Sequence, residues 1–236
     1  MAIFKFENVT KKYHYDKYCT LQDFSFEMKE GISTLLMDVQ SGKSTLCKLV
    51  CGMEKATSGK IYWEDKNLEE VAVVDRNILY LMQKPVFFEN KTVLSNLEYP
   101  LKVRNIKDSK AVALEQIKRF NLDGVAQTKV KNLPQQTKNL VAIARGFLRQ
   151  PKLVLIDGFQ DQLSSEHLAL LQDLINQNNA SALYLTSDTN KIYTQRVAVY
   201  FDNQQKYCGD KEGVQQAIKD LVWLHDMEEQ LNERKQ

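Results

Sequence analysis

Hydrophobic and polar residues alternate over two stretches near the start of the chain. AIFKFENVT and FSFEMKEG place apolar side chains at about every second position, which predicts half-buried strands. A short, mostly apolar run follows from Ile32 to Met37, and KIYWED has the strand pattern again. The first quarter of the chain is therefore predicted to be rich in β-structure.

The pattern changes to a helical period from about Val86 to Gln136, which indicates a helical insertion. Its inward-facing positions are expected to be Val93, Leu94, Leu97, Val112, Leu114, Ile117 and Phe120. Strand signals return at KLVLID, ALYLTSD and RVAVYFD, and the helical stretch HLALLQDLINQ separates the first two. Strands that alternate with helices predict a largely parallel sheet. An amphipathic helix is expected from about Gly213 onward.

Composition and charge exclude several classes of protein. The chain has 236 residues, 43% of them hydrophobic and 26% charged, with a net charge of +2. This balance gives no support for nucleic acid or an anionic membrane as a direct partner. No apolar run approaches the roughly 18–20 residues that span a bilayer, and the start of the chain lacks the apolar stretch of a secretory signal. The four cysteines form no CxxC pair, and Cys47 and Cys51 are interpreted as small core residues of a cytosolic protein.

The strand from Ile32 to Met37 leads into SGKST, where a helix is expected to begin near Gly42–Lys43 and to end about Gly52. The predicted inner face of this helix carries Leu46, Leu49, Val50 and Met53. The triplet GKS after a strand is the end of the phosphate-loop pattern, in which backbone N–H groups and a helix N-terminus face an anion. Met37 occupies the first glycine position of that pattern, so an ordinary strand–turn–helix remains an alternative at this point.

Several longer stretches resemble the ATP-binding subunits of ABC transporters, and they occur in the order found in that family. They are FENVTKKY, SGKSTLCKLVCGMEKATSGKIYW, LMQKPVFFENKTVLSNLEYPL and KNLVAIARGFLRQPKLVLID. The resemblance covers nearly the whole chain. It implies an α/β fold: a P-loop NTPase core with a mostly parallel sheet, an N-terminal antiparallel β-subdomain and an inserted helical subdomain.

The resemblance also implies domain limits within a single ABC-type ATP-binding domain, 1–236. The α/β core is expected at 1–84 and 138–212, the helical subdomain at 85–137, and a C-terminal amphipathic helix at 213–236. An unrelated phosphate-loop kinase or GTPase is a poorer interpretation, because it would leave the later motifs unexplained.

The family's functional positions fall on specific residues, with ATP and Mg²⁺ as the implied cofactors. The expected nucleotide-binding residues are Tyr13, Ser41, Gly42, Lys43, Ser44, Thr45 and Gln83. The expected metal-binding residues are Ser44, Gln83 and Asp157. Tyr13 would stack on the base, Lys43 would reach the β- and γ-phosphates, and Asp157 would support Mg²⁺. Each has a simpler alternative: a surface aromatic for Tyr13, an ordinary loop residue for Gln83 and the end of a buried strand for Asp157.

Other positions depart from the family pattern, and all of them belong to the machinery of hydrolysis or closure. Gly158 stands where the family has a glutamate that polarises the attacking water, and Ser187 stands where it has a histidine; neither can act as a general base of that kind. LPQQT (Leu133–Thr137) replaces the LSGGQ signature, and Ser164 replaces an aspartate. No residue is therefore assigned as catalytic; should hydrolysis occur, the first residues to suspect are Gln160 and Asp161.

The phosphate loop itself departs at Met37 and Gln40, which stand at glycine positions of the family pattern. A positive φ at either residue would cost on the order of 1–2 kcal/mol. Weak nucleotide binding with little or no hydrolysis by this chain is the resulting expectation.

Two functions fit this pattern. The chain is either a transporter subunit that couples nucleotide binding to a transmembrane partner, or a non-enzymatic pseudo-ATPase that scaffolds or regulates a transporter. Either one implies a cytoplasmic protein, peripheral on the inner face of the membrane, that pairs with a second ATP-binding subunit. The apolar stretch Pro85–Leu101 is a candidate groove for a transmembrane helix, and core of the helical subdomain is the alternative interpretation.

Overall fold

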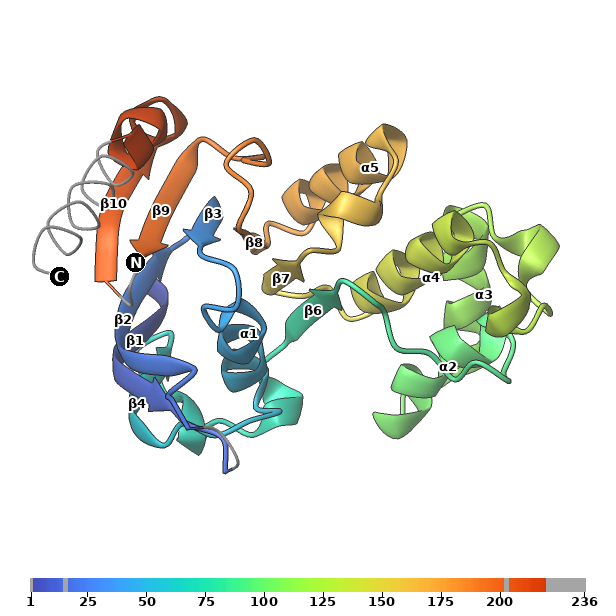
Figure 1. The fold of residues 1–236 in the computed structure, drawn as a ribbon. Helices are drawn as coiled ribbons and strands as arrows, with labels where there is room; N and C mark the ends of the chain where they lie inside the picture. The colour runs from blue at the N-terminus through green and yellow to red at the C-terminus, as the bar shows by residue number, and fades with distance from the viewer. Residues whose placement is uncertain (1, 15–16, 202–203, 220–236) are drawn as a thin grey trace, which may run out of the picture. The chain divides into compact units, whose positions relative to one another are not determined.

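The computed structural model describes residues 2–14, 17–201 and 204–219, shown in Figure 1. The chain forms two compact units, which are described separately. Unit 1 consists of residues 1–72 and 183–236, and unit 2 of residues 73–182. Strand β8 (Ser181–Thr186) spans the boundary between the units and is buried along its whole length. No helix in the described ranges is long and apolar enough to cross a membrane.

Unit 1 contains an antiparallel sheet, which confirms the predicted N-terminal β-subdomain. Its strands, in the order β2-β1-β4-β5, are β2 (Leu21–Lys29), β1 (Ala2–Lys11), β4 (Ser58–Trp63) and β5 (Lys66–Asn67). The 3-10 turn η1 (Leu68–Glu70) follows β5. Alternation along β1 and β2 places four phenylalanines in the core, among them Phe6 and Phe24, whose ring centroids lie 5.5 Å apart.

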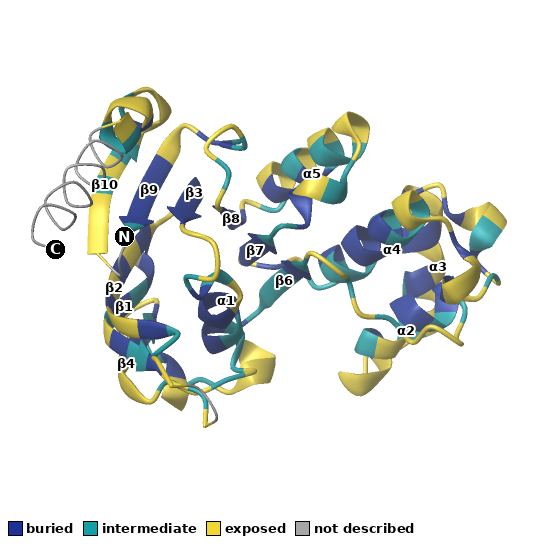
Figure 2. Ribbon diagram, in the orientation of Figure 1, coloured by how far each residue is buried: buried dark blue, intermediate teal, exposed yellow. Residues whose placement is uncertain are grey.

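Unit 1 contains three further strands, and the candidate phosphate loop follows one of them, β3 (Ile32–Met37). Strand β3 pairs in parallel with β9 (Arg196–Phe201), and β10 (Gln204–Asp210) pairs antiparallel with β9. Figure 2 shows β3 and β9 as largely buried and β10 as largely exposed. The parallel pairing of β3 and β9 confirms the prediction for these strands, whereas β10 was not predicted because its polar sequence, QQKYCGD, gives no inward-facing signal.

Helix α1 (Lys43–Cys51) packs its apolar side into unit 1. Leu46, Leu49 and Val50 are buried as predicted, but the prediction for Met53 was wrong, since 59% of its surface is exposed. Gly52 takes a left-handed conformation at the C-cap and ends the helix before Met53. Of the two nearby cysteines, Cys47 is fully buried and Cys51 only partly.

The start of the predicted C-terminal helix lies within the described residues. Residues 211–219 are helical, and Val214 joins a buried cluster with Leu36, Ile192, Val197 and Val199. The rest of the predicted helix, 220–236, lies outside the described residues.

Unit 2 combines two parallel strands with helices. Strand β6 (Ile78–Met82) pairs with β7 (Leu153–Asp157), and the helices are α2 (Val93–Val103), α3 (Ser109–Arg119), α4 (Gln135–Phe147) and α5 (Ser165–Gln177). Short 3-10 turns connect them: η2 (Val73–Asp75), η3 (Asp123–Val125), η4 (Val130–Asn132) and η5 (Gln160–Gln162). Helix α3 buries Ile117, but the prediction for Leu114 was wrong, since it is 42% exposed on the outer side of the helix.

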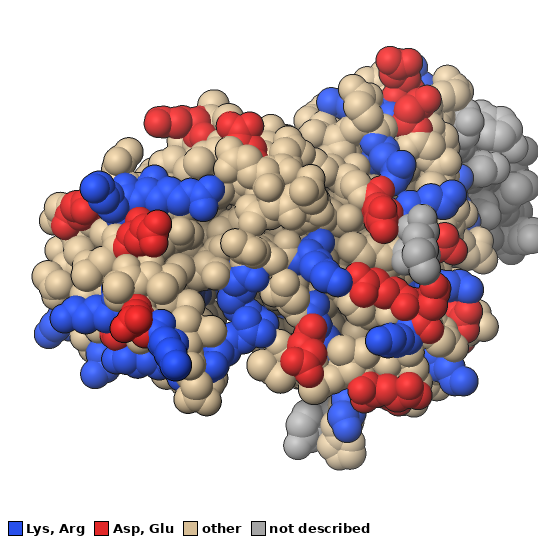
Figure 3. Space-filling model, turned by 180° about the vertical axis from the view of Figure 1, so that it is seen from behind, with Lys and Arg blue, Asp and Glu red and all other residues tan. Residues whose placement is uncertain are grey.

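Charged side chains of both signs are distributed over the surface. On the face drawn in Figure 3, Lys and Arg are interspersed with Asp and Glu. The mixture of signs on this face agrees with the net charge of +2.

Candidate functional site

The loop between β3 and α1 enters the helix through a glycine in the left-handed conformation. Gly42 is the N-cap of α1 and has φ 92°, in the left-handed region that favours glycine. A Cβ atom built on Gly42 would lie 2.8 Å from the carbonyl oxygen of Thr20 and 2.8 Å from Cδ2 of Leu21. Both the backbone conformation and the close approach of β2 therefore require glycine here. Gly42 is thus the residue at which the chain turns into α1, and the N-terminus of α1 directly follows the loop.

Hydrogen bonds within the loop hold it in a compact turn. The Oγ atom of Ser41 donates to the carbonyl oxygen of Asp38 at 2.6 Å, and the N–H of Val39 donates to the Asp38 carboxylate at 2.6 Å. The ammonium group of Lys43 donates to the carbonyl oxygen of Met37 at 3.3 Å and to that of Asp38. The positive charge of Lys43 thus lies at the loop, where it would attract a bound phosphate.

The two glycine-position substitutions in the loop differ in backbone conformation. Gln40 has φ 61°, so this residue carries the cost expected for a non-glycine residue with positive φ. Met37 is the last residue of β3, is 3% exposed and does not have a positive φ. Strain from a positive φ is therefore expected at Gln40 and not at Met37, whose side chain packs in the core.

The predicted base-stacking residue lies beside the helix that follows the loop. The hydroxyl of Tyr13 and Oγ1 of Thr45 are 3.2 Å apart and share a hydrogen bond. The ammonium group of Lys11 lies 4.7 Å from the centroid of the Tyr13 ring and is held by Glu54 at 2.9 Å. Two residues predicted to contact the nucleotide, Tyr13 and Thr45, are thus brought together. Stacking of Tyr13 on a base stays a prediction.

In unit 2, the predicted metal-binding residues follow the two parallel strands. Asp157 ends β7, and its Oδ2 atom accepts a hydrogen bond of 2.9 Å from the hydroxyl of Tyr80 on β6. Gln83 follows β6, and its carbonyl oxygen accepts a hydrogen bond from the side-chain amide of Gln162. Because the carboxyl ends of parallel strands share one edge, Asp157 and Gln83 lie at the same edge of this strand pair. Sequence reasoning missed Tyr80 and Gln162, since a strand tyrosine and a loop glutamine give no local signal.

The positions that depart from the family pattern have structural roles of their own. Gly158, directly after β7, has φ 69°, again in the region that favours glycine. Ser187 is exposed directly after β8. Ser164 is the N-cap of α5, where its hydroxyl accepts the N–H of His167 at 3.2 Å.

The LPQQT segment forms the start of α4. Pro134 is the N-cap and provides no side-chain hydrogen bond to the helix. The side-chain amide of Gln136 donates to the carbonyl oxygen of Gln162 at 3.1 Å, and that of Asn139 donates to the same oxygen at 3.0 Å. Gln135 donates to Oδ1 of Asn139 at 2.9 Å. The side chains of Gln135 and Gln136 are thus hydrogen-bonded within unit 2.

An apolar groove of about 360 Å³ lies in unit 2, in the stretch predicted to receive a membrane helix. Its lining includes Val86, Phe88 and Tyr99, which are 65%, 46% and 51% exposed. Core packing, the alternative interpretation, is therefore wrong for these three side chains, whereas it is confirmed for Val93, Leu94, Leu97 and Leu101 of the same stretch, which are buried. The guanidinium of Arg145 stacks 4.8 Å from the Phe87 ring centroid and donates to the carbonyl oxygen of Val86 at 2.7 Å. Burial lowers the pKa of Arg145.

The chemistry of the predicted metal-binding residues fits Mg²⁺. The hydroxyl of Ser44, the carboxylate of Asp157 and the amide oxygen of Gln83 are hard oxygen donors, as Mg²⁺ prefers. Within the described ranges no cluster of three or more His, Cys, Asp or Glu side chains could hold a metal by itself. This donor set therefore suits a cation that is carried by nucleotide phosphates rather than by a protein cage.

Comparisons with known proteins identify the family. The profile of the family described as ABC transporter matches residues 21–159. The chain is 34% identical over 158 residues to the spermidine/putrescine import ATP-binding protein PotA of Mycoplasma capricolum, a match that covers 66% of this chain and 44% of PotA. The chain thus spans less than half the length of this curated relative.

The fold also matches a solved structure. The similarity to the dimeric, post-hydrolysis structure of the ATP-binding cassette MJ0796 bound to ADP and Pi has a TM-score of 0.74 at 24% identity and covers 88% of this chain and 98% of that one. The chain belongs to the ABC transporter family, and its fold is that of an ATP-binding cassette.

Proposed function

We propose that this chain is the ATP-binding subunit of an ABC transporter, and that it couples nucleotide binding to a transmembrane partner with little or no hydrolysis of its own. The observation that carries the proposal is the left-handed Gly42 at the start of α1 with the Lys43 ammonium over the loop. In this arrangement the N–H groups of α1 and Lys43 bind the phosphates, and Ser41 and Thr45 complete the cradle. Tyr13 contacts the base.

The proposal includes Mg²⁺, to which Ser44 of unit 1 and Gln83 and Asp157 of unit 2 would each offer an oxygen donor. When bound, the ion neutralises phosphate charge. The chain's own contribution is to orient the oxygen donors, and Tyr80 fixes the Asp157 carboxylate by its hydrogen bond of 2.9 Å.

Impaired hydrolysis follows from the groups that are missing. Gly158 has no side chain that could activate water, and Ser187 has no imidazole. Loss of one general base alone typically lowers a rate by about 10²–10⁴-fold. Pro134 has no N–H, and Gln135 and Gln136 fill space above the start of α4, so this segment is poorly suited to close over ATP held by a second subunit.

The groove in unit 2 supports docking on a membrane partner. Its exposed aromatic side chains, Phe88 and Tyr99, pack against each other with ring centroids 4.6 Å apart, and together they form an apolar surface that suits the apolar face of an amphipathic helix. The proposal therefore includes a location on the cytoplasmic face of a membrane and a second ATP-binding subunit as partner. The name of the relative PotA concerns import, which is the direction of transport that we include in the proposal.

The experiment is a thermal-unfolding titration with Mg-ATP. Mg-ATP should raise the Tm of the chain, because a ligand that binds only the folded state stabilises it. Lys43→Ala should abolish the shift, whereas Lys48→Ala, on the same helix but away from the loop, should retain it. A shift of equal size in Lys43→Ala would refute the proposed site, as would the absence of any shift at millimolar Mg-ATP.

The scaffold function is the second candidate, and the hydrogen-bonded glutamines of unit 2 favour it. Gln136 and Asn139 both donate to the carbonyl oxygen of Gln162, which fixes the segment in a form that needs no nucleotide. Affinity purification from membranes separates the two functions. Release of the membrane partner by Mg-ATP supports the coupling subunit, and retention regardless of nucleotide or of Lys43→Ala supports the scaffold.

A further inference from the structure

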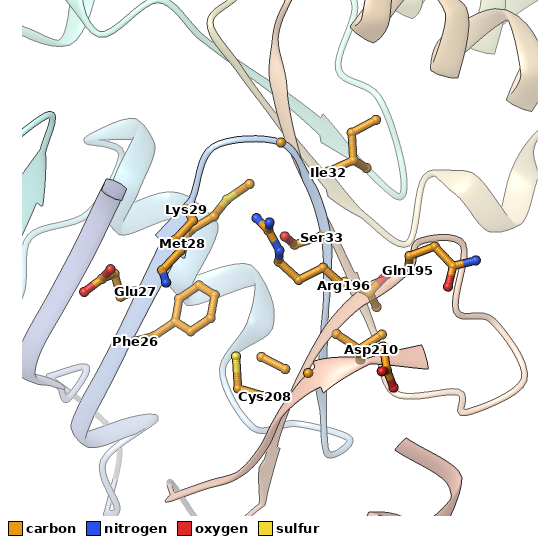
Figure 4. Close-up of a pocket in the computed structure, with 15 residues that line it drawn as sticks. Phe26, Glu27, Met28, Lys29, Ile32, Ser33, Gln195, Arg196, Cys208 and Asp210 are labelled. Atoms are coloured by element: carbon orange, nitrogen blue, oxygen red, sulfur yellow. The ribbon is translucent and has the colours of Figure 1, made fainter. Parts of the chain in front are cut away.

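A second hollow, separate from the phosphate loop, lies entirely within unit 1. It has a volume of about 570 Å³ and is enclosed by the C-terminal half of β2, the starts of β3 and β9, and the end of β10. Figure 4 shows Arg196 and Ser33 side by side, with Phe26 and Met28 toward the β2 side. No residue assigned to the nucleotide site lines this hollow.

The register of the strands explains why the hollow exists. Ala198 is paired with Leu35 on one side and with Cys208 on the other, and both Ala198 and Cys208 have small side chains. The next position along β9 on the same face is Tyr200, whose ring packs 4.7 Å from that of Phe24 and fills the space against β2. The row at Ala198 and Cys208 lacks this bulk, so space remains beneath Phe26 and Met28. The interior of the hollow is therefore mainly apolar.

A row of polar residues crosses the mouth of the hollow. Ser33 is paired with Arg196, and Arg196 with Asp210, so the three side chains share one face of adjacent strands. The guanidinium of Arg196 donates through Nη1 to the carbonyl oxygen of Glu30 at 2.9 Å, which positions it. In the described part of the chain, no carboxylate forms an ion pair with Arg196.

The other two polar residues, Asp210 and Ser33, differ in the hydrogen bonds that their side chains form. Asp210 is engaged, since it accepts the N–H of Gly213 at 2.9 Å and the hydroxyl of Tyr207 at 3.3 Å. Ser33 is 6% exposed, and its Oγ atom has no hydrogen-bond partner among the described residues. A buried hydroxyl without a partner is costly, and this one lies beneath the surface of the hollow, so Arg196 is the polar group presented at the mouth.

We propose that this hollow is a binding site for a small amphipathic carboxylate. The apolar part of the ligand lies between Met28 and the Ala198–Cys208 row, and its carboxylate accepts hydrogen bonds from Arg196. A guanidinium already fixed at one nitrogen presents its remaining N–H groups to a planar acceptor, which favours a carboxylate over a neutral group. The volume lies within the range of small-molecule pockets, about 300–1,000 Å³. The site is independent of the proposed nucleotide function, because it shares no residue with it.

The experiment is calorimetric titration of the full chain with octanoate. Octanol, octylamine and acetate serve as probes of the two halves of the ligand. Octanoate should bind. The three others should bind much more weakly, because octanol and octylamine lack the carboxylate and acetate lacks the apolar chain. Octanoate should also slow alkylation of Cys208, followed by peptide mass spectrometry, while Cys19 reacts at an unchanged rate as the internal control.

Variants test separately the contact of the carboxylate with Arg196 and the contact of the apolar chain with the Ala198–Cys208 row. Arg196→Gln should weaken octanoate binding by about tenfold or more, since it removes charge-assisted hydrogen bonds. Ala198→Leu should abolish binding by filling the hollow, and Cys208→Leu provides a second filled variant should Ala198→Leu fail to fold. Arg119→Gln, an exposed arginine in unit 2, is the matched control and should bind as the parent does.

Two results would overturn the proposal. One is the absence of octanoate binding at millimolar concentration in a chain that unfolds cooperatively. The other is octanoate binding that Arg196→Gln and the filled variants leave unchanged, or that octanol matches in affinity. Either result would show that the hollow is packing space without a recognition role.

Discussion

The hydroxyl of Tyr80 on β6 donates a hydrogen bond of 2.9 Å to Oδ2 of Asp157 at the end of β7. The bond joins neighbouring parallel strands of unit 2 and fixes a carboxylate that the family resemblance assigns to metal binding. Tyr80→Phe removes the donor and keeps the ring. We expect a loss of roughly 1–3 kcal/mol in the free energy of unfolding, because the acceptor is a carboxylate.

Urea unfolding measures this loss, with Tyr18→Phe as the control, since Tyr18 is 75% exposed. Tyr18→Phe should leave the free energy of unfolding unchanged. Equal midpoints for the two variants would mean that the Tyr80 hydroxyl adds nothing to the fold of unit 2.

Gly42→Ala tests the conformation of the phosphate loop. The left-handed backbone costs an alanine about 1–2 kcal/mol, and the overlap of its Cβ with Thr20 and Leu21 adds to this. We expect a lower Tm and the loss of any Tm shift with Mg-ATP. Gly124→Ala is the matched control, since nothing lies within 4 Å of its Cβ position and its φ is not positive. If Gly42→Ala and Gly124→Ala have the same Tm, the geometry described for the loop is wrong.

Gln40→Gly tests whether this residue obstructs the loop. Gln40 has φ 61° and Gln150 has φ 46°, so glycine should relieve similar backbone strain at both positions, worth up to about 1 kcal/mol. Only Gln40→Gly should also increase the Tm shift caused by Mg-ATP, because Gln40 is part of the loop and Gln150 is not. A larger ATP-induced shift in Gln150→Gly than in Gln40→Gly would contradict the obstruction by Gln40.

Gly158→Glu tests whether hydrolysis can be restored by replacing one side chain. Because φ is 69° at this position, glutamate should lower the free energy of unfolding by about 1–2 kcal/mol. We expect phosphate release to stay at the level of Lys43→Ala, since the other departures remain. Gly158→Asn should cost less stability, because asparagine tolerates the left-handed region. Turnover by Gly158→Glu that depends on Lys43 would disprove this expectation.

Local sequence patterns were sufficient to predict the bounds of an element where one of its faces is buried. The bounds of β3 agree with the apolar run from Ile32 to Met37, and α1 starts at Lys43 and ends at Gly52 as the turn signals indicate. The errors occur where tertiary packing decides. Met53 lies beyond the glycine that ends α1, and Leu114 is apolar but faces outward on α3.

The sequence alone was sufficient to predict the family and the order of its motifs, because these depend on residue identity and local spacing. It also determined that Gly42 begins a helix. The tertiary structure decided which departures matter to the backbone: Gln40 and Gly158 have positive φ, whereas Met37 is part of the core. It also brought Tyr80 to Asp157 and Ser33 to Arg196, pairs 77 and more than 150 residues apart. Strand pairing sets such neighbours over long sequence separations, and no local pattern encodes them.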